Sequence, residues 1–187
     1  MLPCRLRLGR ASIVIALLAL LSFTLPLRAG TVEDARAALA EGDRLLKSGK
    51  FDESRTQYKK VLTLFRKAKR NERRRLFTEN RVAHHNLKIF DLLKNVEGAE
   101  FRDGDYTGSA RGYKGPVEVK VTVKDGRIDG VEIVRTRENR PRNAKKAVPQ
   151  RIVAAQSVLV DAVSGATVTS NAIREAAARA LNEARAE

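Results

Sequence analysis

The 187-residue chain has a single cysteine and no tryptophan, and aromatic residues make up only 5% of it. The cysteine, Cys4, lies close to the N-terminus and has no second cysteine with which to form a disulfide or a zinc-thiolate site. Cys4 also lies within the signal peptide predicted below, so the mature chain would contain no cysteine. Disulfide scaffolds, zinc-thiolate sites and thiol redox chemistry are therefore excluded. Hydrophobic residues make up 43% of the chain, which is enough for a core, but the low aromatic content predicts a core with few large side chains.

Histidine is also scarce, because His84 and His85 are the only two in the sequence. On a helix, adjacent side chains point about 100° apart, so these two histidines do not share a face. A metal-chelating pair on a helix is spaced four residues apart. We therefore expect surface or interface histidines and no metal site.

Long apolar runs are absent except near the N-terminus. Three arginines precede an apolar run over residues 11–27, and Ala29 supplies a small residue at a cleavage position. This pattern predicts a signal peptide over residues 1–29 and a periplasmic or otherwise extracytoplasmic location. An uncleaved N-terminal anchor is the alternative, although a spanning helix needs about 20 apolar residues.

The net charge of +15 is concentrated in the middle of the chain. Residues 31–96 carry 17 basic and 9 acidic residues, a net +8, whereas residues 97–187 carry 16 and 13, a net +3. Seven of the basic residues lie within 66–75. This run is either a solvated helix end or a contact for anionic lipid or an acidic partner. The predicted location and the lack of interleaved aromatic residues argue against nucleic acid.

Residues 31–96 have the apolar spacing of helices. Two periodic runs flank a break at Gly49, and a third runs from about 72 to 93. They predict a helical hairpin with a cap helix. The first run holds Ala35, Ala38, Leu39, Gly42, Leu45 and Leu46, and the second holds Phe51, Ser54, Tyr58, Val61, Leu62 and Phe65. The hairpin partially resembles a single tetratricopeptide repeat.

Residues 97–187 change to the two-residue period of strands. A short strand over 105–110 precedes an alternating strand over 117–124, a turn at Asp125-Gly126 and a return strand with a bulge at Asp129-Gly130. A polar loop over 136–145 comes next. A helix over 148–157 with Pro149 in its first turn and a final helix over 170–184 complete the segment. The fold class is therefore α+β, with a small antiparallel sheet and helices after the helical module.

The most informative stretch runs from Asp161 to Ser170 and reads D-A-V-S-G-A-T-V-T-S. It places a glycine and small hydroxyl residues in a turn directly before an alanine-rich helix. The unpaired N–H groups and the dipole at a helix N-terminus favour an anion such as phosphate.

Four motifs in this segment resemble, in order, those of the FMN-binding domain family, which includes the C subunit of the sodium-pumping NADH:quinone reductase and the G subunit of the Rnf complex. They are D-G-x-Y-x-G at 103–108, G-Y-x-G at 112–115, D-G-x-I at 125–128 and the attachment motif D-x-x-S/T-G-A-T at 161–167. The resemblance covers roughly residues 101–183. It implies that Thr167 carries FMN through a phosphoester bond, which a separate magnesium-dependent flavin transferase makes from FAD.

The same resemblance and the residue chemistry indicate a set of cofactor-binding residues. Ser164, Gly165 and Ala166 make the turn compact, and Thr169 and Ser170 cap the helix and bind phosphate oxygens. Asp161 orients the turn or is recognised by the transferase. Gly112 and Gly115 let the backbone approach the flavin ring and Tyr113 stacks on it, unless they form an ordinary glycine turn. Arg140, Arg142 and Lys145 either flank the flavin edge or are a solvated charge run.

No catalytic residue is expected, because a flavin supplies its own redox chemistry. The sequence thus predicts an extracytoplasmic electron-transfer flavoprotein that passes electrons between redox partners, with a basic helical module that docks a partner or a membrane surface. The alternative is a non-enzymatic interaction or sensor protein that acts through the helical module.

Overall fold

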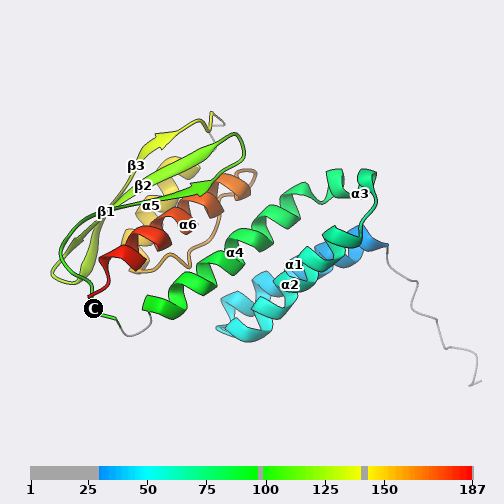
Figure 1. The fold of residues 1–187 in the computed structure, drawn as a ribbon, viewed down its shortest axis with the longest axis horizontal. Coiled ribbons are helices and arrows are strands. Elements are labelled where there is room, and N and C mark those ends of the chain that lie inside the picture. The colour runs from blue at the N-terminus through cyan, green and yellow to red at the C-terminus, as the bar shows by residue number, and fades with distance from the viewer. Residues whose placement is uncertain (1–29, 97–98, 140–142, 187) are drawn as a thin grey trace, which may run out of the picture. The chain divides into compact units, whose positions relative to one another are not determined.

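The computed structural model describes residues 30–96, 99–139 and 143–186. The predicted signal peptide and the loop residues Arg140 and Arg142 lie outside these residues. The described helices are α1 (Thr31–Lys47), α2 (Phe51–Lys67), α3 (Arg70–Arg75), α4 (Phe77–Val96), α5 (Ala144–Ala155) and α6 (Thr167–Ala184), and the strands are β1 (Gly104–Arg111), β2 (Pro116–Lys124) and β3 (Arg127–Thr136). Figure 1 shows these elements, which confirm the predicted α+β class.

Helices α1 and α2 form the predicted hairpin, and Gly49 ends α1 with a φ of 74°. The two helices approach closely at Gly42, where an added Cβ would lie 2.7 Å from the ring of Tyr58. The Ser54 hydroxyl donates a hydrogen bond to the carbonyl of Gly42 at 2.7 Å, and the Tyr58 hydroxyl donates to Asp43 at 2.6 Å. The hairpin is therefore held by polar contacts as well as by apolar packing.

The single cap helix predicted over 72–93 is wrong, because the chain breaks at Leu76 into α3 and α4. Leu76 has a φ of −96° and a ψ of 10°, and its side chain is fully buried. It packs in one apolar cluster with Val32, Ala35 and Ala68.

Strands β1, β2 and β3 pair antiparallel in that order. The predicted turn is confirmed, with Asp125 and Gly126 at φ values of 52° and 69°. Thr122 pairs with Gly130 and Val123 with Ile128, so Asp129 is the extra residue of the predicted bulge. Four valines of β2, at 117, 119, 121 and 123, point into the core.

Helix α5 begins at Ala144, four residues before the predicted start, and Pro149 lies inside it rather than in its first turn. An interior proline removes one backbone hydrogen bond. The helix persists because Ala144, Val148, Pro149 and Ile152 are all buried. Tertiary packing here outweighs local helix propensity.

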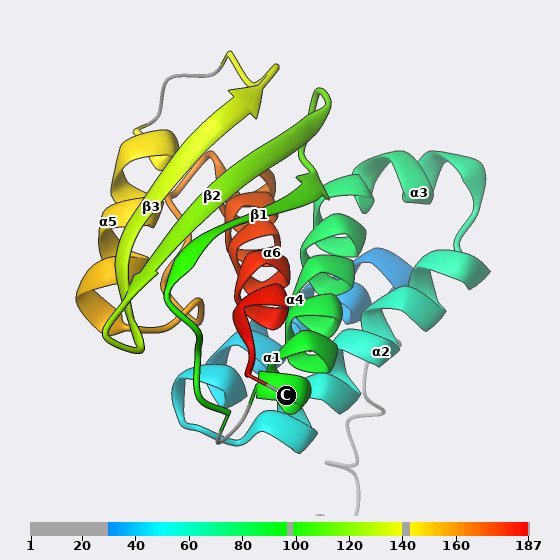
Figure 2. The ribbon, with the colours of Figure 1, turned by 60° about the vertical axis from the view of Figure 1, so that its left-hand side comes forward.

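Helix α6 is the centre of the fold. One of its sides packs on β1 and β2, and the other packs on α4, which in turn contacts α1 and α2. Figure 2 shows this order of layers, with α6 between the sheet and α4. Sandwiched in this way, α6 buries 14 of its 18 residues, many of them alanines. The chain from Thr31 onward therefore forms one compact unit.

Candidate cofactor site at the start of helix α6

The predicted attachment motif forms a tight turn that leads directly into α6. The Ala166 N–H donates to the carbonyl of Val163 at 3.0 Å, and Gly165 adopts a φ of 73°. Glycine suits the third position of such a turn because a side chain is strained at positive φ. Ser164 and Gly165 are exposed, and Thr167 is the first residue of α6 and partly exposed.

Helix α6 begins three residues earlier than predicted, so Thr169 and Ser170 do not cap it. The cap residue is Ala166, which makes no side-chain capping bond. Ser170 is fully buried; its hydroxyl accepts from the Val163 N–H at 3.0 Å and donates to the Ala166 carbonyl at 2.9 Å. Ser170 therefore fastens the turn to the helix. Without a side-chain cap, the first N–H groups of α6 face outward from the helix end.

A residue that the sequence analysis did not single out, Glu138, joins two of the predicted motifs. Its carboxylate is buried, and one oxygen accepts from the Thr169 hydroxyl at 2.7 Å. The other oxygen accepts from the Lys114 N–H at 2.6 Å, and the Lys145 ammonium donates to the Glu138 carbonyl at 3.3 Å. The G-Y-x-G turn and the first turn of α6, far apart in sequence, are thus tied together.

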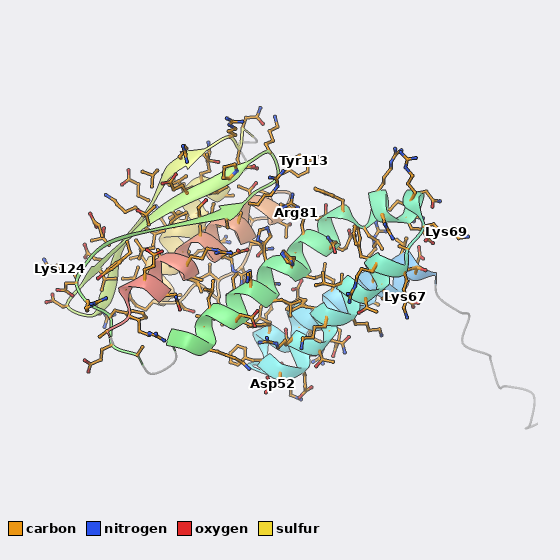
Figure 3. All side chains as sticks on the ribbon, viewed as in Figure 1. Asp52, Lys67, Lys69, Arg81, Tyr113 and Lys124 are labelled. Carbon is orange, nitrogen blue, oxygen red and sulfur yellow. The ribbon has the colours of Figure 1, made fainter. Side chains whose placement is uncertain are left out.

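Contacts within the protein alone account for the compact turn over residues 112–115. The Gly112 N–H donates to the carbonyl of Gly115 at 2.7 Å, and a Cβ on Gly112 would lie 2.8 Å from the Glu138 carboxylate. Tyr113 is half exposed, and its ring meets that of Phe77 edge to face at 6.0 Å between centroids. Figure 3 shows Tyr113 near Arg81, whose guanidinium lies 5.4 Å from the Phe77 ring.

Thr167 lines a cavity of about 1110 Å³, here called the interlayer cavity. It lies between helices α1 to α4, here called the helical layer, and the half of the fold that contains the sheet. Its lining comes from α1, α2, α4, α5, α6 and the segment before the attachment turn. The polar and charged members of that lining are Asp43, Lys47, Asn86, Arg151, Asp161, Thr167, Asn171 and Arg174. The volume is slightly above the range of about 300–1,000 Å³ that is usual for small-molecule and cofactor sites.

Asp161, the first residue of the attachment motif, lies at the mouth of this cavity. Its carboxylate pairs with Lys47 of α1 at 3.1 Å, and its carbonyl accepts from Arg151 of α5 at 2.6 Å. The Asp161 side chain is largely exposed, so the ion pair itself contributes little stability. Its effect is positional, since it connects the attachment segment to the helical layer.

The arrangement fits a phosphate-bearing cofactor. A threonine hydroxyl stands on the first turn of a long helix whose N–H groups lack a side-chain cap, and it opens onto a cavity that contains a buried arginine. The fold and the site together define a small α+β cofactor-binding domain.

Residues 112–182, within this domain, match the FMN-binding domain family. The match includes the G-Y-x-G turn, the β2–β3 hairpin and the attachment motif, and it leaves α1 to α4 outside. It supports a flavin-binding role for this part of the chain.

Two curated relatives extend the comparison. An uncharacterized protein of Treponema pallidum (strain Nichols) is 41% identical over 105 residues, which are 55% of this chain and 29% of the relative. An NADH:acrylate oxidoreductase of Vibrio harveyi is 32% identical over 92 residues, which are 48% of this chain and 9% of the relative. The aligned part is thus less than a third of either relative.

Proposed function

We propose that this chain is an extracytoplasmic electron-transfer flavoprotein that holds FMN by a phosphoester bond to Thr167. The observation that supports this most strongly is the position of Thr167, the first residue of α6, beside an exposed Ser164-Gly165 turn and on the wall of the interlayer cavity. The family match and an oxidoreductase among the relatives favour electron transfer as the role.

Attachment of FMN to Thr167 requires a separate enzyme. A threonine hydroxyl is a weak nucleophile unless a base activates it. Among the described residues, neither a carboxylate nor a histidine accepts a hydrogen bond from Thr167. A flavin transferase would form the bond from Thr167 Oγ1 to the phosphate of FMN while AMP leaves from FAD and the hydroxyl proton passes to water.

The residues of the site would then bind and orient the cofactor. The outward-facing N–H groups of α6 stabilise the phosphate charge. Ser170 and Glu138 hold the attachment turn and the 112–115 turn in place through the bonds described above. When bound, FMN supplies the exchange of electrons with redox partner proteins, so no catalytic acid or base is needed.

Replacement of Thr167 with alanine is expected to abolish covalent flavin entirely. The full chain is co-produced with an active flavin transferase, exported, and measured by intact mass. Wild type is expected to gain the mass of one FMN residue, and the Thr167→Ala variant none. Thr107→Ala, which removes an exposed threonine from β1, is the matched control and should load normally.

An unmodified wild-type chain, beside a control substrate that the same transferase does load, would refute covalent attachment. It would favour the alternative, a non-enzymatic interaction or sensor protein that acts through the helical module. Full biological activity of the Thr167→Ala variant would point the same way.

We further propose that the basic segment 66–75 docks the protein on an anionic membrane surface. It contains seven basic residues and one acidic residue, and all seven basic side chains are exposed. Figure 3 shows Lys67 and Lys69 at the end of the helical layer where α2 meets α3. Among the described residues no helix has the length and apolar character to cross a bilayer.

Neutralising three of these charges, in the variant Lys67→Gln/Arg70→Gln/Arg74→Gln, is expected to weaken binding to phosphatidylglycerol vesicles by about 100-fold. Each basic residue near an anionic surface contributes about 1 kcal/mol. Co-sedimentation measures the effect, and Lys120→Gln/Lys124→Gln/Arg135→Gln on the sheet is the matched control. Equal binding by wild type and variant, or equal binding to neutral phosphatidylcholine, would contradict the proposal.

A further inference from the structure

Arg174 is a buried cation without an ion pair. Its side chain is only 4% exposed, and no carboxylate among the described residues lies within ion-pairing distance of it. Its contacts are neutral acceptors: Nε donates to the Val158 carbonyl at 2.9 Å, and Nη1 donates to Asn171 at 2.5 Å and Asn86 at 3.4 Å. Burial lowers the pKa of the guanidinium from its ordinary value. The carboxylates of Asp43 and Asp161, which also line the cavity, oppose this shift from a distance, but neither forms an ion pair with Arg174. A buried charge is usually paired, so the guanidinium has no direct anionic partner among the described residues.

The guanidinium also keeps unused donors. Arginine has five N–H donors in a planar fork, and the three bonds just described use only Nε and Nη1. Nη2 therefore has no hydrogen-bond partner among the described residues, although Arg174 lines the interlayer cavity. A ligand with several acceptor atoms in one plane would satisfy it.

Arg174 and the predicted attachment residue share one face of α6. Thr167, Asn171 and Arg174 are spaced at i, i+4 and i+7, which places them in one row along the helix. All three line the interlayer cavity. Long side chains on a helix lean toward its N-terminus, so the guanidinium reaches back from position 174 toward Thr167.

The opposite wall of the cavity comes from outside the matched domain. Asp43 and Lys47 of α1 and Val82 and Asn86 of α4 line it, whereas the family match begins at residue 112. Asn86 reaches across to Arg174, and Lys47 reaches across to Asp161. The helical layer therefore forms one wall of the cavity.

We propose that the interlayer cavity binds the isoalloxazine ring of the flavin, and that Arg174 donates hydrogen bonds to the ring's carbonyl and nitrogen acceptors. The proposal rests on the proposed function in taking flavin as the ligand, but it does not depend on the covalent bond. It gives the helical layer a second role as one wall of the flavin site.

The test uses the full chain carrying Thr167→Ala, so that only non-covalent binding is measured. Riboflavin and FMN are titrated separately, and flavin fluorescence reports binding. Adding Arg174→Gln is expected to weaken binding of both flavins by about 10- to 100-fold, as expected when a charged hydrogen-bond donor is removed. Arg135→Gln is the control, because this exposed arginine of β3 is not part of the cavity lining.

A second variant tests the cavity without removing a buried charge. Ala155 is exposed and lines the cavity, so Ala155→Trp is expected to block both flavins while the fold is retained. Ala37→Trp, at an exposed position of α1 outside the lining, is its control. Circular dichroism and thermal unfolding establish that each variant is folded.

Three results would overturn the proposal. The first is unchanged flavin binding by a folded Ala155→Trp or Arg174→Gln variant. The second is weakened binding of FMN with unchanged binding of riboflavin, which would assign Arg174 to the phosphate instead of the ring. The third is no binding of either flavin by the Thr167→Ala chain. None of these results would refute covalent attachment to Thr167, because the intact mass of the wild-type chain measures that attachment separately.

Discussion

Replacing Gly108 with alanine is expected to destabilise the protein by at least about 3 kcal/mol and to lower its yield of folded material. Gly108 lies in β1 where that strand crosses α6. A Cβ at this position would lie 2.0 Å from the carbonyl oxygen of Ala176 and 2.8 Å from the backbone nitrogen of Ala180. Both are main-chain atoms of a helix enclosed on two sides, so they cannot move aside as a flexible side chain would.

Urea unfolding, followed by circular dichroism, measures this effect as a lower midpoint. Gly130→Ala in β3 is the matched control, since a Cβ there meets nothing closer than 3.7 Å and the residue has no positive φ. That variant should be near wild type. An alanine at position 108 with a wild-type midpoint would show that α6 and β1 are not in this close contact.

Gly108 also shows which features of the fold could not be predicted from the sequence. It was part of the D-G-x-Y-x-G motif, but its role was not predictable, because the contact that requires glycine comes from residues about seventy positions later. The features that were predicted correctly have local causes. The valine alternation of β2, the Asp125-Gly126 turn and the bulge at Asp129 all depend on neighbouring residues alone.

The same distinction holds for the candidate site. The attachment turn was recognisable because its residues are contiguous, and the structure places Thr167 on the first turn of α6. Glu138 was missed because a single glutamate in a polar loop carries no local signal. Its burial depends on donors from Lys114 and Thr169, which approach only in the folded chain. Arg174 was missed for a similar reason, because its contacts with Asn86 and Val158 form only in the folded chain.

Glu175 joins the two halves of the fold, and its replacement with alanine is expected to cost about 3 kcal/mol. The carboxylate is buried between α4 and α6, where one oxygen bonds His85 Nδ1 at 2.6 Å and the other accepts two bonds from Arg179 at 2.7 and 3.0 Å. His84, the neighbour of His85, is exposed, as expected for adjacent helical residues. The alanine variant would leave a buried imidazole without its partner, and urea unfolding at about pH 7 measures the loss.

The Glu175 contribution should depend on pH in a defined direction. Burial acts to raise the pKa of this carboxyl, but hydrogen bonds from His85 and Arg179 outweigh it and hold the pKa below its ordinary value of 4.5. A carboxyl with a lowered pKa stabilises the fold above its unfolded value, and that stabilisation is lost as the pH falls through the folded value. The difference between wild type and Glu175→Ala should therefore be full at about pH 7 and shrink below about pH 4.5.

The control for this helix is Glu183→Ala, which removes an exposed carboxylate from the same element. Its free energy of unfolding should stay within about 0.5 kcal/mol of the wild-type value at every pH tested. Two results would contradict this account. The Glu175→Ala variant could lose no more stability than Glu183→Ala, or it could lose the same amount at about pH 3 and pH 7. Either result would show that the His85–Glu175–Arg179 contact does not keep the carboxylate charged. Because α4 forms part of the wall of the interlayer cavity, a loss of this contact should also weaken flavin binding in the Thr167→Ala chain. The Glu175 variant thus tests whether the helical layer and the flavin-binding domain are energetically coupled as well as adjacent.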